Sequence, residues 1–182
     1  SYGADSAEYR TERETFTKVI SYGQVLAPGS GPQWFKVWTK AGQILEYGNT
    51  GESRIEAQGK NYPSVRIWAL NKISDKKGNY LTVTYAEDNA NGDFYPTRID
   101  YNYTGTPAVA NASVQFVADP AGRPDVTPAY IAGSVVKALN RLAYVRTYVG
   151  GTLVKEYRLT YNNLGSTRRS KLTSLQECDS AG

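Results

Sequence analysis

The sequence predicts an all-β fold, built as an antiparallel meander of hairpins. Its 182 residues include 15 Tyr, 4 Phe and 3 Trp, and aromatic side chains suit the half-buried surface of a pleated sheet. It also contains 17 Gly and 8 Pro, which punctuate turns. From about residue 14 onward, apolar and polar residues alternate with the period of two that is typical of strands.

The first half of the chain contains strand patterns joined by short turn signals. Gly42 supplies the first turn, the polar stretch 75–79 the second, and the run 88–93 the third. Consecutive strands joined in this way form a meander. The expected strands are residues 34–40, 43–47, 65–70, 80–85 and 97–103.

The clearest hairpin signal comes late in the chain, where residues 142–149 and 152–161 flank Gly150 and Gly151. Two glycines accept the positive φ angles that a tight primed turn requires. A two-residue loop fixes the register and sets Arg146 against Lys155, which is mildly unfavourable. The aromatic and aliphatic pairs expected on one side are Tyr144 with Tyr157, Leu142 with Leu159, and Tyr148 with Leu153.

Two segments between these regions are less regular. Residues 104–128 are rich in Pro, Ala and Gly, and we expect a long loop interrupted by one short strand at 113–118. Residues 134–141 allow a strand or a short helix, because Val135 and Leu139 also recur at helical spacing.

Charge and hydropathy argue against nucleic-acid and membrane partners. The net charge is +4, but Lys and Arg are interspersed with acidic residues. The densest basic cluster is Arg168, Arg169 and Lys171, which is more typical of a solvated loop than of a nucleic-acid patch. No apolar run has the roughly 18 residues that a membrane-spanning helix needs. The absence of Met indicates that the chain is one segment, residues 1–182, of a longer protein.

The residue types give little support for catalysis, and we expect no cofactor and no enzyme activity. There is no His, which excludes a Cys–His nucleophile pair within the chain. The single cysteine, Cys178, is either a free thiol or a residue whose disulfide partner lies elsewhere. Asp93 and Asp100 flank a predicted strand, but spacing alone does not make them a glycosidase pair.

Several sequence segments, spread over nearly the whole length of the chain and in the same order, resemble one family. The family is the N-terminal region of the Salmonella virulence-plasmid B protein and of insecticidal toxin-complex B components, which also occurs in large bacterial proteins with Rhs/YD repeats. The matching phrases are residues 9–12, 35–50, 53–59, 68–75, 78–85, 95–101 and 157–161.

The resemblance implies a structural role. In toxin-complex B components, this region is similar to a β-rich part of a hollow shell that encloses a toxic C-terminal enzyme. The chain would then be a non-catalytic, extracellular or cell-surface scaffold, part of a larger β-shell or β-sandwich-like structure that packs against adjacent segments of its parent polypeptide. Residues 171–182 resemble the start of a YD-like unit, so their strand is expected to expose an unpaired edge and to allow self-association.

Two groups of residues are candidate ligand sites. Asp88, Asn89, Asn91 and Asp93 bring side-chain oxygens together, as calcium requires, although the same run also makes an ordinary hairpin turn. The alternative to a scaffold is a carbohydrate-binding or adhesin module, in which exposed aromatic faces stack on sugar rings. The candidate aromatic surface consists of Trp34, Trp38, Trp68, Tyr101 and Tyr103, which equally suit interdomain packing.

Overall fold

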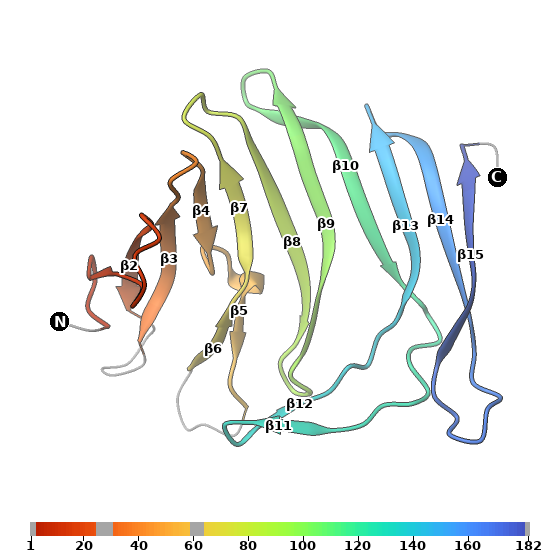
Figure 1. Ribbon diagram of the computed structural model, residues 1–182. Helices are drawn as coiled ribbons and strands as arrows, with labels where there is room; N and C mark the ends of the chain where they lie inside the picture. Colours follow the sequence, from red (N-terminus) through yellow and green to blue (C-terminus); the bar gives the residue numbers. More distant parts are fainter. Residues whose placement is uncertain (1–2, 25–30, 59–63, 181–182) are drawn as a thin grey trace.

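The computed structural model describes residues 3–24, 31–58 and 64–180, and within them an antiparallel sheet of eleven strands dominates the fold (Figure 1). The strands lie side by side in chain order, which confirms the predicted all-β meander. In order across the sheet they are β1 (Glu8–Tyr9), β2 (Lys18–Gln24), β3 (Pro32–Trp38), β4 (Ile44–Tyr47), β7 (Leu70–Ser74), β8 (Tyr80–Asp88), β9 (Asp93–Thr104), β10 (Val109–Ala118), β13 (Leu142–Val149), β14 (Thr152–Asn162) and β15 (Lys171–Asp179).

Two small hairpins leave this order. One pairs β5 (Arg54–Glu56) with β6 (Val65–Trp68) and follows a short 3₁₀ turn, η1 (Gly51–Ser53). The other pairs β11 (Ala129–Ile131) with β12 (Ser134–Val136). No helix in the described ranges has the length and apolar character to cross a membrane.

The predicted turns of the first half form as their residues dictate. Gly42 adopts a φ of +85°, and its N–H donates to the carbonyl of Thr39 at 3.0 Å. At the β7–β8 turn, an Asp75 carboxylate oxygen accepts hydrogen bonds from the N–H groups of Lys77 and Asn79, at 2.8 and 3.0 Å. The hydrogen bond from the Asn79 side-chain amide, together with these backbone bonds, stabilises the ionised carboxylate and lowers the pKa of Asp75.

The strand predicted over residues 65–70 is wrong in its pairing, because it divides at Ala69. Val65–Trp68 pairs with β5, and only the part from Leu70 onward joins β8. Ala69 itself is buried, its N–H donating to Ser53 at 2.8 Å and its carbonyl accepting from Gly48 at 2.9 Å. The chain therefore changes sheets at this residue, which an uninterrupted alternation cannot reveal.

The late hairpin is confirmed, but most of its predicted register is wrong. Gly150 and Gly151 have φ angles of 56° and 81°, as a primed turn requires, and Tyr148 faces Leu153 as expected. A bulge between Thr147 and Tyr148 then shifts the rest by one residue. Tyr144 consequently faces Arg158 rather than Tyr157, the predicted pair of Leu142 with Leu159 does not form, and Arg146 faces Glu156 rather than Lys155.

The region predicted as a long loop contains more strand than expected, because the strand predicted at 113–118 is part of the longer β10. β9 continues to Thr104 and β10 begins at Val109, so the 104–128 loop reduces to a tight turn and the segment from Asp119 to Pro128. The helical option for residues 134–141 is also wrong. Ser134–Val136 is a strand whose backbone pairs with β11, and the chain between it and β13 contains no helix.

Residues 129–140, here called the strap, run along one end of the sheet, below the β8–β9 turn in the view of Figure 1. The strap is fastened by bonds to distant parts of the chain. The N–H of Lys137 donates to the carbonyl of Asn91 at 3.1 Å, and the hydroxyl of Ser134 accepts from the N–H of Gln58 at 2.6 Å. The strap thus joins the end of the small β5–β6 sheet to the main sheet.

A single layer leaves little interior. Among the described residues, the buried apolar side chains are Ile55, Ala69, Ala112 and Cys178. The thickest packing lies where the β5–β6 sheet rests against β3: Trp68 meets Phe35 edge to face at 5.0 Å between ring centroids. The small sheet is therefore the one place where a second layer covers the main sheet within the described residues.

The strand near the end of the chain lies at an edge of the sheet. β15 pairs with β14 on one side, and its other side has no neighbour among the described residues. Leu172 and Leu175 are 48% and 63% exposed. The expectation of an exposed edge is confirmed for Lys171–Asp179, while residues 181–182 of the predicted terminal unit lie outside the described residues.

Candidate functional site

The two faces of the large sheet differ in chemistry. Successive side chains of a strand point to opposite faces, so residues in register across neighbouring strands share one face. One set of such rows is almost wholly apolar, and we call the surface that it forms the apolar face. Its rows are Val19–Val37–Leu45–Ile73–Leu81, Val83–Ile99–Val114 and Phe116–Val145–Tyr157.

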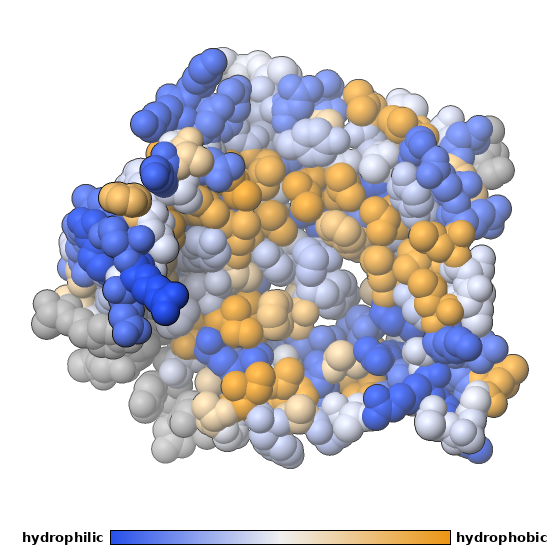
Figure 2. Space-filling view, viewed as in Figure 1, coloured by the Kyte–Doolittle hydropathy of each residue, from blue (hydrophilic) through white to orange (hydrophobic). Residues whose placement is uncertain are grey.

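The apolar face is largely uncovered. Its residues over the central strands, such as Val83, Ile99 and Val114, are only partly buried. Figure 2 shows apolar residues gathered in a band that crosses the molecule from one side of the sheet to the other. Soluble monomers rarely expose a continuous apolar surface of this kind, and such surfaces mark sites of protein contact.

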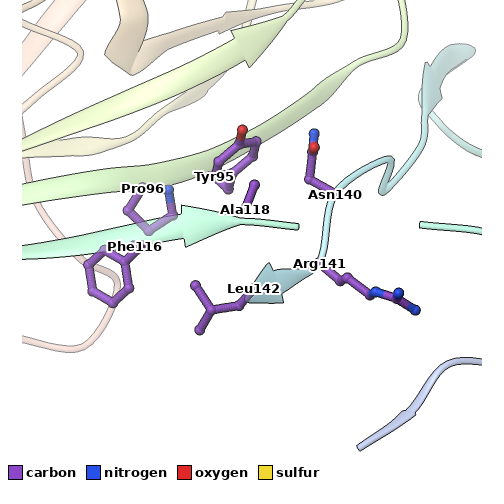
Figure 3. Close-up of a pocket in the computed structure, with 7 residues that line it drawn as sticks. All are labelled: Tyr95, Pro96, Phe116, Ala118, Asn140, Arg141 and Leu142. Atoms are coloured by element: carbon purple, nitrogen blue, oxygen red, sulfur yellow. The ribbon is translucent and has the colours of Figure 1, made fainter. Parts of the chain in front are cut away.

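A pocket interrupts the apolar face between β9, the end of β10 and the start of β13. Its volume is about 210 Å³, and its apolar wall includes Tyr95, Phe116 and Leu142 (Figure 3). Arg141 also lines it, but the guanidinium points away from the other labelled side chains. That group is already engaged, at 2.7 Å from Asp119 and 4.9 Å from the ring centroid of Tyr161. The pocket therefore offers room for an apolar side chain rather than for a charged ligand.

The opposite face, which we call the polar face, carries rows of charged and polar residues. One row places Lys36, Glu46 and Lys72 on adjacent strands, with Lys36 Nζ 3.8 Å from Glu46. A second row is Arg98–Gln115–Arg146–Glu156–Cys178. Opposite charges on neighbouring strands stabilise a sheet, so this face is satisfied internally and needs no covering layer.

Glu156 is a buried carboxylate of the polar face that two arginines bind. It is 6% exposed and accepts hydrogen bonds from Arg158 Nε and Arg146 Nε, each at 2.5 Å. The two guanidinium groups hold the pKa of Glu156 below its ordinary value, Arg158 contributing most. The bulge that shifts the β13–β14 register is what brings Arg146 opposite this carboxylate.

The five predicted aromatic residues do not form one surface. Trp34, Trp38 and Tyr103 belong to the polar face. There Trp34 stacks on Tyr22 at 4.4 Å, and Tyr103 stacks on Tyr80 at 4.1 Å. Both stacked rings have one side covered, whereas Trp38 lies beneath the ammonium groups of Lys18 and Lys36 at 5.7 and 5.6 Å.

The remaining two aromatic residues lie on the other side of the sheet. The Trp68 Nε1–H donates to the carbonyls of Pro32 and Gln33, at 3.2 and 3.1 Å, and its ring packs on Phe35. Tyr101 is 38% exposed and lines a shallow pocket with Leu81. A shared aromatic platform is therefore not formed, and binding of a sugar by any one of these rings stays a prediction.

The predicted calcium run forms the β8–β9 turn and anchors the strap. Asp88 accepts from the Asn91 side-chain amide at 2.8 Å, and Asn89 is exposed. Asn91 Oδ1 accepts from Lys137 Nζ at 2.8 Å.

Asp93, 7% exposed, accepts from the Leu139 N–H and the Asn140 side-chain amide, at 3.1 and 2.9 Å. Within the described residues, no group of three or more acidic, Cys or His side chains is placed to hold a metal ion.

Asp93 and Asp100 are likewise committed to separate partners. Asp100 lies 2.7 Å from Arg98 Nε on the same strand, while Asp93 binds the strap. Sequence reasoning did not find the role of Asp93 as an anchor, nor a contact between Glu56 and Glu87 across the two sheets. The signal for the apolar face was present in the alternation of β8, β9 and β10, but only the register shows that these residues form one surface.

Comparisons with known proteins agree with this architecture. The family described as "Salmonella virulence plasmid 65kDa B protein" matches residues 5–110. No curated protein matches the chain. The structure of the N-terminal domain of effector protein SpvB from Salmonella typhimurium strain LT2 is similar with a TM-score of 0.73 and 14% identity, covering 92% of this chain and 67% of that one.

Two larger toxin structures share the same fold. The Photorhabdus luminescens Tc holotoxin pore with the TccC3-D651A mutation has a TM-score of 0.74 and 16% identity, covering 93% of this chain and 10% of that one. The TcdB2-TccC3-Cdc42 complex has a TM-score of 0.71 and 14% identity, with the same coverage of 93% and 10%. The chain thus spans about a tenth of these toxin chains, and at such identities the likeness concerns the fold. Because the family match covers more than half of its residues, this chain belongs to the Salmonella virulence plasmid 65kDa B protein family.

Proposed function

We propose that this chain is a non-catalytic wall segment of a large, secreted, toxin-like protein. The observation that carries the proposal is a broad sheet with one apolar face that the described residues leave largely uncovered. A wall needs a continuous sheet and a surface against which neighbouring segments can pack, and it needs no catalytic constellation. The similar fold of toxin-complex chains supports the same role.

Adjacent segments of the parent polypeptide are the proposed covering layer. The apolar band and the 210 Å³ pocket would receive apolar side chains, while the charged rows of the polar face stay in contact with water. Burying apolar area releases roughly 25 cal/mol per Å², so covering this face would stabilise both the sheet and the segment that covers it.

Val83 and Thr84 provide a matched test because they are neighbours on β8 that point to opposite faces. In the isolated chain, Val83→Glu and Thr84→Glu should change the free energy of unfolding by amounts that differ by less than about 1 kcal/mol, since neither site is fully buried. In the parent protein, Val83→Glu should cost at least about 2 kcal/mol more than Thr84→Glu, because an unpaired carboxylate would be buried.

Thermal and urea unfolding of both proteins would measure this difference. Equal effects of the two substitutions in the parent protein would show that the apolar face stays open there, and the wall proposal would then fail.

The exposed edge of β15 makes a second prediction. An unpaired strand edge recruits other strands, so the isolated chain should associate as its concentration rises. Thr173→Pro removes one backbone donor from β15 and should reduce this association, whereas Thr173→Ala keeps the donor and removes only the hydroxyl bond to the Thr160 carbonyl. Light scattering across concentration measures the mass. A chain that remains monomeric, or two variants that associate equally, would rule out association through the β15 edge.

A further inference from the structure

Two carboxyl groups meet where the small sheet rests on the large one. Glu56 ends β5, and Glu87 lies near the end of β8. Glu56 Oε2 and Glu87 Oε1 are both inaccessible to water, and no donor in the described structure reaches either atom. The two side chains are nevertheless within hydrogen-bonding contact of each other. Two ionised carboxylates can only accept, so this contact requires a proton on one of them.

The surroundings favour that proton. Burial is the largest influence and raises the pKa of Glu87 to about 7, with the neighbouring Glu56 next. Glu52 of η1 adds negative charge, and the side chain of Asn89, in the β8–β9 turn, hydrogen-bonds Glu87 and opposes the shift. β9 presents the uncharged Phe94 opposite Glu87. From β6 comes Arg66, whose Nη2 is directed to the Gly92 carbonyl at 3.4 Å and whose Nε has no partner.

The position of the pair gives it a mechanical role. The small sheet is also held by the backbone bonds at Ala69 and the packing of Trp68 on Phe35, and by the strap through the bond between Gln58 and Ser134. Glu56 and Glu87 join its β5 strand directly to β8. Two ionised carboxylates at this point would repel each other and separate the two layers.

We propose that one proton shared between Glu56 and Glu87 latches the β5–β6 sheet onto the main sheet, closing it in mildly acidic solution and loosening it above neutral pH. The sign follows from the raised pKa of Glu87. The folded state holds the proton more tightly than the unfolded chain does, so the stabilisation is complete below the ordinary value of 4.5 and is lost as the pH rises through about 7.

Hydrogen exchange of the backbone amides of Arg54–Glu56 and Val65–Trp68 tests the latch. After correction for intrinsic exchange rates, the opening equilibrium of these amides should rise roughly tenfold or more between about pH 5.5 and about pH 8.5, since one pKa unit corresponds to a factor of ten. The amides of β13 and β14 serve as the internal reference, because no part of the pair contacts them, and they should not follow this change.

The Glu87→Gln variant distinguishes a latch that depends on the shared proton from one that depends only on packing. The glutamine amide donates to Glu56 at every pH, so the small sheet should stay closed and its exchange should lose the pH dependence. Glu52→Gln removes a neighbouring charge outside the pair and should keep the dependence. The proposal is overturned if wild-type exchange does not change with pH, or if Glu87→Gln changes with pH as the wild type does.

Discussion

Alanine at position 92 is expected to lower the free energy of unfolding by about 3 kcal/mol, the sum of left-handed backbone strain and steric overlap. Gly92 has a φ of +64°, and a Cβ there would lie 2.1 Å from the carbonyl oxygen of Val135. Because that oxygen belongs to the backbone of β12, no side-chain rotation can relieve the contact. The strap must move away, and its bonds to Asn91 and Asp93 would weaken with it.

Gly78→Ala is the matched control for this effect. Gly78 has a φ of +90°, and a Cβ there would meet nothing within 4 Å. Its cost should be only the backbone strain, about 1–2 kcal/mol. Urea unfolding of both variants gives the comparison, and hydrogen exchange of Ser134–Val136 should increase in Gly92→Ala alone. Equal costs for the two variants would mean that the strap does not press on the β8–β9 turn.

Ile55→Ala is expected to cost about 2–5 kcal/mol, the range for deleting a fully buried aliphatic side chain. Ile55 is 0% exposed, and it lies in the small sheet where the fold has its thickest packing. In a single-layer protein there is little other core to compensate for the loss. The small sheet should consequently open more often, which hydrogen exchange of Val65–Trp68 would detect.

Val109→Ala provides the contrasting substitution, because Val109 is a β-branched strand residue that is 65% exposed. Its effect should be within about 0.5 kcal/mol, as for most surface changes. Chemical denaturation of both variants would measure the difference. If Ile55→Ala were as mild as Val109→Ala, the stability of the chain would not depend on the second layer.

The turns and the type of secondary structure could be predicted well from the sequence. The glycines at 42, 150 and 151 adopt the positive φ angles that their turns need, and Asp75 organises its turn through hydrogen bonds to residues two and four positions ahead. These features depend on near neighbours in the chain. The period-two alternation of side chains identifies the segments between the turns as strands. The antiparallel meander follows from the two together.

Register and pairing partners were harder to predict because they depend on single inserted residues and on distant strands. The bulge at Thr147 and Tyr148 leaves no mark in the alternation, yet it replaces an unfavourable Arg146–Lys155 pair by the ion pair of Arg146 with Glu156. Residues 134–141 have helical spacing, but their backbone bonds are taken by β11 and by the β8–β9 turn.

The sequence by itself determined the all-β class and the main hairpins, because turn chemistry and period-two patterning are local, and the resemblance of its segments indicated the family. Only the tertiary structure decided which side chains share a face, where the second layer sits and which charged groups meet. It divided the five aromatic residues between two faces, tied Asp93 to the strap and brought Glu56 against Glu87. The physical reason is that these contacts join strands far apart in the chain, whose relative placement depends on the packing of the whole sheet.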